Sequence, residues 1–144
     1  MSSILTRNVF FALFVGAALL IFFGIGPAKA SETRDQYGYL HVEAPAVAEI
    51  IANSPEVIIL DIRTPSEFQQ GHIKGAVNVD YYAADFEEKI AALDPSARYV
   101  LHCRSGSRSS KALSILSENK LENVTHLRSG IIGWTGSGYP LNQE

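Results

Sequence analysis

The single cysteine of the 144-residue chain, Cys103, begins a stretch whose residue types suit nucleophilic chemistry. In Cys103-Arg-Ser-Gly-Ser-Arg108, three small residues lie between two arginines. Small residues let a loop curl so that its backbone N–H groups point inward, and such a ring of amides binds anions. Amide donors and positive charge favour a thiolate, so we expect the pKa of Cys103 to lie below its ordinary value of about 8.5. The stretch therefore predicts a thiolate nucleophile in an anion-binding loop.

The spacing of the loop bears on which anion it holds. Its second arginine, Arg108, lies five positions after Cys103, and Ser109 follows. Tyrosine-phosphatase-like loops place the arginine six positions after the cysteine, which leaves room for a tetrahedral phosphate. The tighter ring favours a single terminal sulfur on Cys103, and a small oxyanion phosphatase or arsenate reductase is the less favoured alternative. A lone cysteine is commonly a small buried hydrophobe, but that interpretation does not account for the loop that follows this one.

Strand-like and helix-like segments alternate on both sides of this loop. Short apolar runs predict strands, and apolar residues every three or four positions predict helices. Strands are expected at 40–42, 57–60, 76–79, 99–101 and 124–127. Helices are expected over 45–53, 64–71, 83–93 and 109–120. This order indicates an α/β fold with a mainly parallel central sheet of about five strands flanked by helices. Ligands of such sheets bind beyond the carboxyl ends of the strands, where Asp61 and Cys103 fall.

The chain resembles the rhodanese family of sulfurtransferases in its single-domain form, over nearly all of residues 39–141. The resemblance rests on the loop 103–108 with Ser109, on the segment 61–76 (DIRTPSEFQQGHIKGA), and on the C-terminal residues Gly130, Gly133-Trp134 and Gly138-Tyr-Pro140. It implies a rhodanese-like fold and a ping-pong reaction. In that reaction the Cys103 thiolate takes the outer sulfur of a donor such as thiosulfate, becomes a persulfide, and passes the sulfur to a thiophilic acceptor. The resemblance implies no metal and no organic cofactor.

Catalysis is accordingly assigned to Cys103 alone. The residues expected to bind the substrate are those of the loop: Arg104, Ser105, Gly106, Ser107, Arg108 and Ser109. A structural role near the site is expected for Asp61, Arg63, Glu67, His72 and Trp134. Asp61 is expected to cap the turn after its strand, Arg63 to pair with Glu67 four residues later, and Trp134 to fill the core beneath the loop. His102 precedes Cys103 on a strand, so its side chain should point to the opposite face and form no dyad with the thiol.

The expected partners are small. They are an anionic, thiosulfate-like sulfur donor and a thiol, dithiol or cyanide acceptor. The alternative within the same fold is a sulfur carrier that delivers a persulfide to a protein partner. The four histidines, at 41, 72, 102 and 126, lack metal-ligand spacing, so no metal site is predicted.

The N-terminal residues 1–30 have the pattern of a secretory signal peptide. Arg7 precedes an apolar run from Val9 to Gly26, and Ala28-Lys29-Ala30 offers small residues for cleavage. An uncleaved membrane anchor is the alternative, because the run of 18 residues approaches the length of a span. We therefore expect a periplasmic or secreted protein, or else a domain anchored outside the cytoplasm and touching the membrane only through this segment.

The remaining chain divides into a flexible start at 31–38 and a domain at 39–144. Without residues 1–30 it carries ten basic and fifteen acidic side chains, a formal charge of −5. This balance argues against nucleic acid as a partner.

Overall fold

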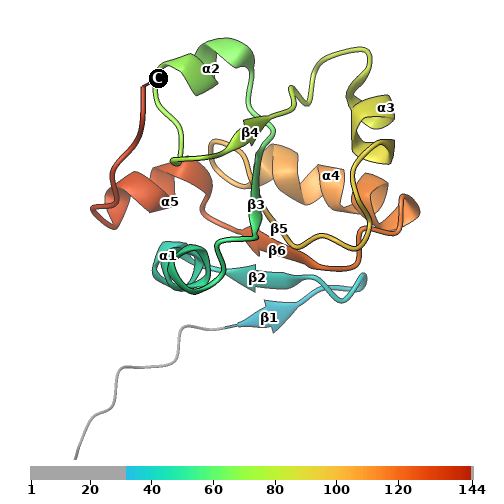
Figure 1. The fold of residues 1–144 in the computed structure, drawn as a ribbon, viewed down its shortest axis with the longest axis horizontal. Helices are drawn as coiled ribbons and strands as arrows, with labels where there is room; N and C mark the ends of the chain where they lie inside the picture. Colours follow the sequence, from blue (N-terminus) through green and yellow to red (C-terminus); the bar gives the residue numbers. More distant parts are fainter. Residues whose placement is uncertain (1–31, 144) are drawn as a thin grey trace, which may run out of the picture.

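The computed structural model describes residues 32–143 as one mixed sheet with helices on both faces (Figure 1). Strand order is β1-β2-β6-β5-β3-β4, and every neighbouring pair is parallel except β1 with β2. The strands are β1 (Thr33–Arg34), β2 (Leu40–Val42), β3 (Ile58–Asp61), β4 (Val77–Asn78), β5 (Tyr99–His102) and β6 (Val124–Leu127). The helices are α1 (Ala44–Asn53), α2 (Pro65–Gln69), α3 (Phe86–Ala91), α4 (Ser107–Glu118) and α5 (Gly130–Gly136). The α/β class and the mainly parallel sheet are confirmed. The predicted signal peptide lies outside the described residues, within which no helix has the length and apolarity of a membrane span.

Alternation along the strands divides the core between the two faces of the sheet. In β5, Tyr99 and Leu101 join a cluster that packs under α3 and α4, and Cys103 continues this alternation. Val100 faces the other way, into a cluster shared with α1 and α5. Side chains on a strand point alternately to opposite faces, and both faces of this sheet are covered, so the central strands are apolar throughout. Cys103 therefore lies on the α4 face.

The sixth strand lies outside the domain boundary that the sequence suggests. Thr33 and Arg34 form β1, which pairs antiparallel with His41 and Leu40 of β2. Asp35 directs the turn between them, because its carboxylate accepts hydrogen bonds from the amides of Tyr37 and Tyr39 at 2.9 and 3.0 Å. Residues 33–34 of the expected flexible start are thus part of the sheet.

Two helices differ from expectation near the loop. The helix expected at 109 begins at Ser107, because Gly106 adopts φ +91° and its carbonyl accepts the amide of Ser110 at 2.9 Å. Helix α5 was not expected, since its sequence contains three glycines. Its amides have partners in the loop: those of Ile131 and Ile132 donate to the carbonyls of Cys103 and Arg104 at 3.0 and 3.1 Å. The start of α5 thus holds the beginning of the cysteine loop.

The C-terminal segment returns to the edge of the fold beside α2 (Figure 1). His72 and Asn142 exchange two backbone hydrogen bonds, of 2.9 and 2.8 Å, as an isolated antiparallel bridge. The indole of Trp134 donates to the carbonyl of Pro140 at 2.9 Å and lies against the Tyr139 ring. These contacts tie the last residues to α2 and α5.

Candidate active site

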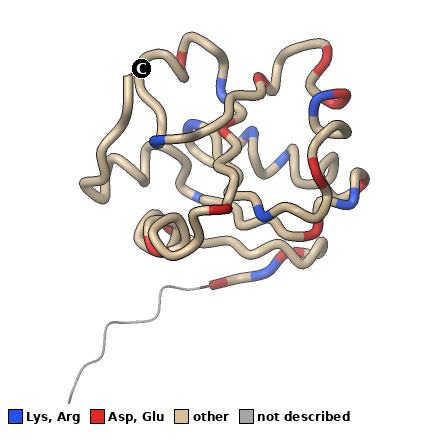
Figure 2. The backbone as a smooth tube through the Cα atoms, in the orientation of Figure 1, with Lys and Arg blue, Asp and Glu red and all other residues tan. Residues whose placement is uncertain are grey.

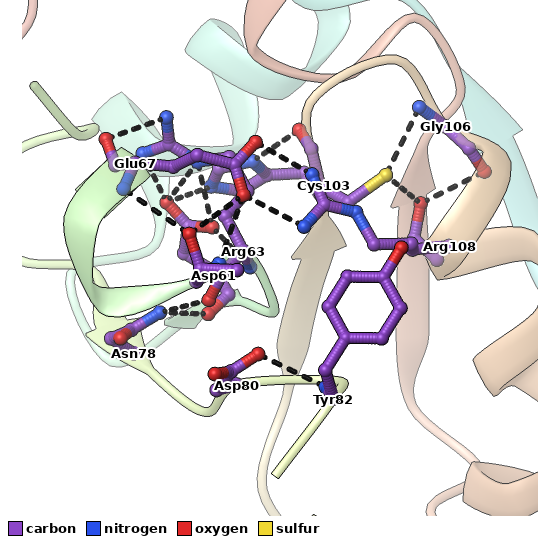
Figure 3. A network of polar contacts seen from close by, with 12 residues as sticks. Asp61, Arg63, Glu67, Asn78, Asp80, Tyr82, Cys103, Gly106 and Arg108 are labelled. Atoms are coloured by element: carbon purple, nitrogen blue, oxygen red, sulfur yellow. Dashed lines mark hydrogen bonds and ion pairs between the residues drawn. The ribbon is translucent and has the colours of Figure 1, made fainter. Parts of the chain in front are cut away.

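The sulfur of Cys103 accepts hydrogen bonds from two directions (Figure 3). The amide of Gly106 lies 3.2 Å from the sulfur, and the hydroxyl of Ser109, in the first turn of α4, lies 3.4 Å from it. Cys103 is only 1% exposed, so a substrate reaches a recessed sulfur. Within the same loop, Arg104, Ser105 and Ser107 are exposed.

Close packing of two glycines against backbone gives the loop its shape. A side chain at Gly106 would collide with the carbonyl oxygen of Arg128, and its φ of +91° is strained for other residues. At Gly130, with φ +59°, a Cβ would lie 2.6 Å from the carbonyl oxygen of Arg104. Since the Arg104 carbonyl points toward α5, the amide of Ser105 in the same trans peptide points the opposite way, toward the sulfur. Helix α5 thus orients an amide that the thiolate uses.

Hydrogen bonds lower the pKa of Cys103 below its ordinary value. Burial acts to raise this pKa, but the hydroxyl of Ser109 and the amides of Ser109, Ser105 and Gly106 outweigh it. The direction agrees with the sequence prediction, while the cause differs, because neutral donors rather than arginines make the main contribution. The arrangement can hold a thiolate, or an anionic sulfur attached to it, without a neighbouring base.

The arginines are paired or exposed. Arg108 donates through both terminal nitrogens to the two carboxylate oxygens of Glu67, at 2.8 and 2.7 Å (Figure 3). Its Cζ also lies 5.5 Å from the centre of the Tyr82 ring, which is 68% exposed. Arg104 is exposed, and its side chain makes no hydrogen bond or ion pair within residues 32–143. Glu67 therefore neutralises much of the charge that the sequence assigned to the loop.

Glu67 also fixes the start of α2. It forms a capping box with Thr64, whose hydroxyl accepts the Glu67 amide at 3.3 Å while the carboxylate accepts the Thr64 amide at 3.0 Å. Hydrogen bonds from Arg108, followed by those from Thr64, lower the pKa of Glu67 to about 2 against the opposing effect of burial. One carboxylate thus joins the capped helix to the end of the cysteine loop.

Asp61 and Arg63 form a separate buried pair. Arg63 Nη2 lies 2.6 Å from Asp61 Oδ2, and Arg63 Nε lies 2.9 Å from both carboxylate oxygens. Asp61 also caps its turn by accepting the Arg63 amide at 3.0 Å. The expected pairing of Arg63 with the Glu67 carboxylate is wrong: Arg63 reaches only the Glu67 carbonyl, at 3.1 Å. The carboxylate partner of Arg63 is therefore the fully buried Asp61.

The remaining predicted residues lie away from the sulfur. His72 stacks on Phe68 with ring centres 3.9 Å apart and donates from Nδ1 to the Phe68 carbonyl. Trp134 is buried in the cluster on the face opposite Cys103, so α5 contacts the loop through its first residues rather than through this ring. His102, fully buried, donates from Nδ1 to the carbonyl of Cys103 at 3.1 Å and points away from the thiol.

Sequence reasoning also missed a contact on the far side of Ser109. Ser109 lies 2.8 Å from Nε2 of His126, a fully buried residue of β6. A histidine inside an apolar strand was the available signal, because a buried polar side chain needs a hydrogen-bond partner. Across residues 32–143, no group of three or more His, Cys, Asp or Glu side chains is arranged to hold a metal ion.

Comparison with known proteins identifies the fold and its family. The sequence matches the family described as rhodanese-like domain over residues 43–137. The chain belongs to the rhodanese-like family. It is 30% identical over 100 residues to a sulfurtransferase of Allochromatium vinosum, covering 69% of this chain and 92% of that protein. It is 35% identical over 91 residues to the chloroplastic thiosulfate sulfurtransferase 16 of Arabidopsis thaliana, covering 56% and 76%.

A solved structure supports the same assignment. The crystal structure of a rhodanese-related protein from Thermoplasma volcanium aligns with a TM-score of 0.60 and 31% identity, over 67% of this chain and 94% of that one. This rhodanese-like domain is therefore a sulfurtransferase homologue with a single buried cysteine, and its relatives indicate sulfur donors and acceptors as the general class of substrate.

Proposed function

We propose that this rhodanese-like protein is a thiosulfate sulfurtransferase that carries sulfur on Cys103. The Cys103 thiolate attacks the outer sulfur of thiosulfate or a similar small anionic donor. A bond forms between the two sulfurs, the sulfur–sulfur bond of the donor breaks, and sulfite leaves with the bonding pair. The persulfide anion then gives its outer sulfur to a thiol, dithiol or cyanide acceptor, and the thiolate is restored.

The observation that carries this proposal is the set of donors around the sulfur. The Gly106 amide and the Ser109 hydroxyl already contact Sγ, and the amide of Ser105 supports the same anion. Neutral donors fixed by the backbone need no reorganisation when charge moves from the thiolate to a terminal sulfur. Exposed Arg104 is available to the sulfonate end of a donor, and Ser107 in the same loop is exposed as well.

Intact-mass spectrometry tests the covalent step. After incubation with thiosulfate and removal of the excess, the wild-type protein is expected to gain one sulfur, whereas Cys103→Ser gains none and releases no sulfite. Added cyanide should remove the sulfur and produce thiocyanate over many cycles. Absence of the one-sulfur adduct from folded wild-type protein would refute the proposal.

The same measurements separate the alternatives. An adduct that forms but turns over only with a protein acceptor would identify a sulfur carrier, and the small-molecule part of the proposal would be wrong. Hydrolysis of an aryl phosphate that depends on Cys103 would identify a phosphatase instead. The single-residue difference in loop length and the engagement of Arg108 by Glu67 both favour sulfur over phosphate.

The proposed place of action is outside the cytoplasm. The apolar run 9–26 and the small residues at 28–30 support export. In the described fold, acidic and basic positions are interspersed (Figure 2). N-terminal sequencing of the exported protein tests this: a new N terminus near residue 31 supports cleavage, and an intact Met1 supports an anchor.

A further inference from the structure

A line of polar side chains continues from Cys103 across the sheet to Asp35. Ser109 lies 3.4 Å from the sulfur and 2.8 Å from His126 Nε2. The two Nδ1 atoms of His126 and His41 are 2.9 Å apart, and His41 Nε2 lies 3.1 Å from Asp35 Oδ2. Each step is within hydrogen-bonding distance. We refer to Ser109, His126, His41 and Asp35 as the histidine chain.

The histidine chain follows from the register of the sheet. His41 of β2 pairs with His126 of the parallel strand β6, and His126 is next to Leu101 of β5, so all three face α4 together with Cys103. The imidazole rings meet edge to face, 4.9 Å between centres. The amides of Tyr37 and Tyr39 hold one oxygen of Asp35, which leaves the other for His41.

Asp35 gives the chain of hydrogen bonds a direction. A carboxylate only accepts, so His41 donates from Nε2, and the Nδ1 of a neutral His41 must accept. His126 therefore donates from Nδ1, and its Nε2 accepts the Ser109 hydroxyl. The oxygen of Ser109 then accepts the S–H of the neutral thiol, and once the thiolate has formed the Ser109 hydroxyl donates to the sulfur across the same 3.4 Å. With both histidines neutral, every proton in the line points from the thiol toward Asp35.

Burial separates the inner part of the line from water. Ser109 and His126 are fully buried, whereas the side chains of His41 and Asp35 are 15% and 20% exposed. Burial, and then the neighbouring His41, lower the pKa of His126 to about 4. This ring therefore stays neutral: it accepts a proton at one nitrogen and releases one from the other. Burial acts to raise the pKa of Asp35, but the hydrogen bonds from His41 and the two tyrosine amides leave it lowered. A charge is thus better accommodated at the outer end.

We propose that the histidine chain is a proton path that takes the proton of the Cys103 thiol to His41. The thiol proton moves to Ser109, the Ser109 proton to His126 Nε2, and the His126 Nδ1 proton to His41 Nδ1. Cys103 becomes a thiolate, and His41 becomes an imidazolium paired with the Asp35 carboxylate, so no charge is gained or lost. The reverse transfer protonates the thiolate once sulfur has left. This inference rests on the proposed function, in which the thiolate must form and be restored in each cycle.

The other charges near the line do not supply this path. His102 faces the opposite side of the sheet, and Arg128, at the end of β6, pairs with Glu43 at 2.7 Å. Arg108, next to Ser109 on α4, is paired with Glu67. Within residues 32–143, the charged side chain that is hydrogen-bonded to either histidine of the line is Asp35.

The rate of Cys103 alkylation by iodoacetamide across pH tests the path in the full-length protein. Asp35→Asn and His41→Gln are expected to slow alkylation at neutral pH about tenfold and to move the midpoint of the pH profile upward, since a hydrogen bond to a charged group contributes at least this much. Asp35→Glu, which keeps the carboxylate, should restore part of the rate. These residues do not touch the sulfur, and the sign of the Asp35→Asn effect identifies the line, because loss of that negative charge acting through space would favour the thiolate.

Glu43→Gln is the matched control, because it removes a carboxylate two residues after His41 that lies outside the line. Loss of a nearby negative charge alone favours a thiolate, so through-space electrostatics predicts faster alkylation in both Glu43→Gln and Asp35→Asn. The proton path predicts slower alkylation in Asp35→Asn only. An unchanged or faster rate in Asp35→Asn, with native circular dichroism, would overturn the proposal.

The two proposals fail separately in these experiments. Alkylation uses no sulfur donor, so the pH profiles report on the proton path even in a protein that forms no persulfide. Conversely, a normal one-sulfur adduct in wild-type protein whose alkylation profile is unaffected by Asp35→Asn would leave the sulfurtransferase intact without a proton path.

Discussion

On one side of Cys103 the polar residues are charged and paired, whereas on the other side they are neutral and directed at the sulfur. The charged flank consists of Asp61, Arg63, Glu67 and Arg108, in which each arginine has its own carboxylate (Figure 3). The neutral flank consists of Ser105, Gly106, Ser109 and His126, whose amides and side chains stabilise the thiolate directly or through Ser109. Charge close to the nucleophile is therefore not the same as charge available to it. The ion pairs hold the loop and α2 in place, and the neutral donors lower the pKa of Cys103.

The largest effect is expected from distorting the neutral flank at Gly106. In Gly106→Ala the new methyl group collides with the Arg128 carbonyl and is strained at φ +91°, which displaces the amide that contacts the sulfur. Sulfur transfer should fall on the order of a hundredfold, as expected for misplacing a group by about 1 Å. Rates of thiocyanate formation measure this. Gly136→Ala, in open space on α5, is the control and should retain activity.

Removing one donor from the neutral flank should have the next largest effect. Ser109→Ala deletes the hydroxyl at 3.4 Å from the sulfur and disconnects His126. The pKa of Cys103 should rise, which slows alkylation at neutral pH about tenfold, as expected for the loss of one hydrogen bond to a charged group. Ser110→Ala, at the exposed neighbouring position, should leave the profile unchanged. An unaltered pKa in Ser109→Ala would contradict the assignment of thiolate stabilisation to this flank.

Breaking the charged flank should affect stability more than reactivity. Glu67 has a folded pKa of about 2 against an ordinary value of 4.5, so its contribution is complete above about pH 4.5 and is lost as the pH falls through 2. Glu67→Gln should lower the free energy of unfolding at neutral pH by about 1–2 kcal/mol, and the difference from wild type should vanish near pH 2. Urea unfolding at several pH values measures this, with the exposed Glu87→Gln as control.

The Glu67→Gln variant also tests whether the charge of Arg108 acts on Cys103. Once Glu67 is neutral, Arg108 keeps its charge without a carboxylate partner, and that charge favours the Cys103 thiolate. Alkylation at neutral pH should therefore quicken a few-fold. A slower reaction would show that Arg108 acts on the sulfur through its position rather than its charge.

The smallest effect is expected from substitution of Arg104, the exposed residue between the two flanks. Arg104→Ala should raise the KM for thiosulfate about threefold, because an exposed ion pair with a substrate contributes little, and should leave the pKa of Cys103 unchanged. Lys111→Ala, exposed on α4, is the matched control. A large loss of kcat instead would place Arg104 in contact with the reacting sulfurs.

The sequence predicts most of this fold because its local patterns are strong. The strand before Asp61 and the helix that follows Thr64 appear where expected. Helix α5 was missed because glycine-rich segments predict turns, and here Gly130 serves close contact with the Cys103 and Arg104 carbonyls, which are 27 and 26 residues away in sequence. Contacts of this kind depend on the tertiary fold.

The candidate site shows the same limit. The cysteine loop is identified by its own residues, but the partner of Arg108 is not, since Glu67 lies 41 residues earlier on another element. His41 and His126 are 85 residues apart and meet only because β2 and β6 are neighbours in the sheet. Spacing along the chain could not reveal them, whereas the order of the strands does.

The bridge between His72 and Asn142 has a mechanical consequence. Its two backbone hydrogen bonds are the outermost that fasten the C-terminal end to the edge of the fold. When force is applied to this end, the load reaches that bridge and the Trp134–Pro140 bond before it reaches any of the parallel strands. Under tension the protein should therefore unfold in two steps. The C-terminal segment detaches from α2 first, while β5 and the cysteine loop keep their structure.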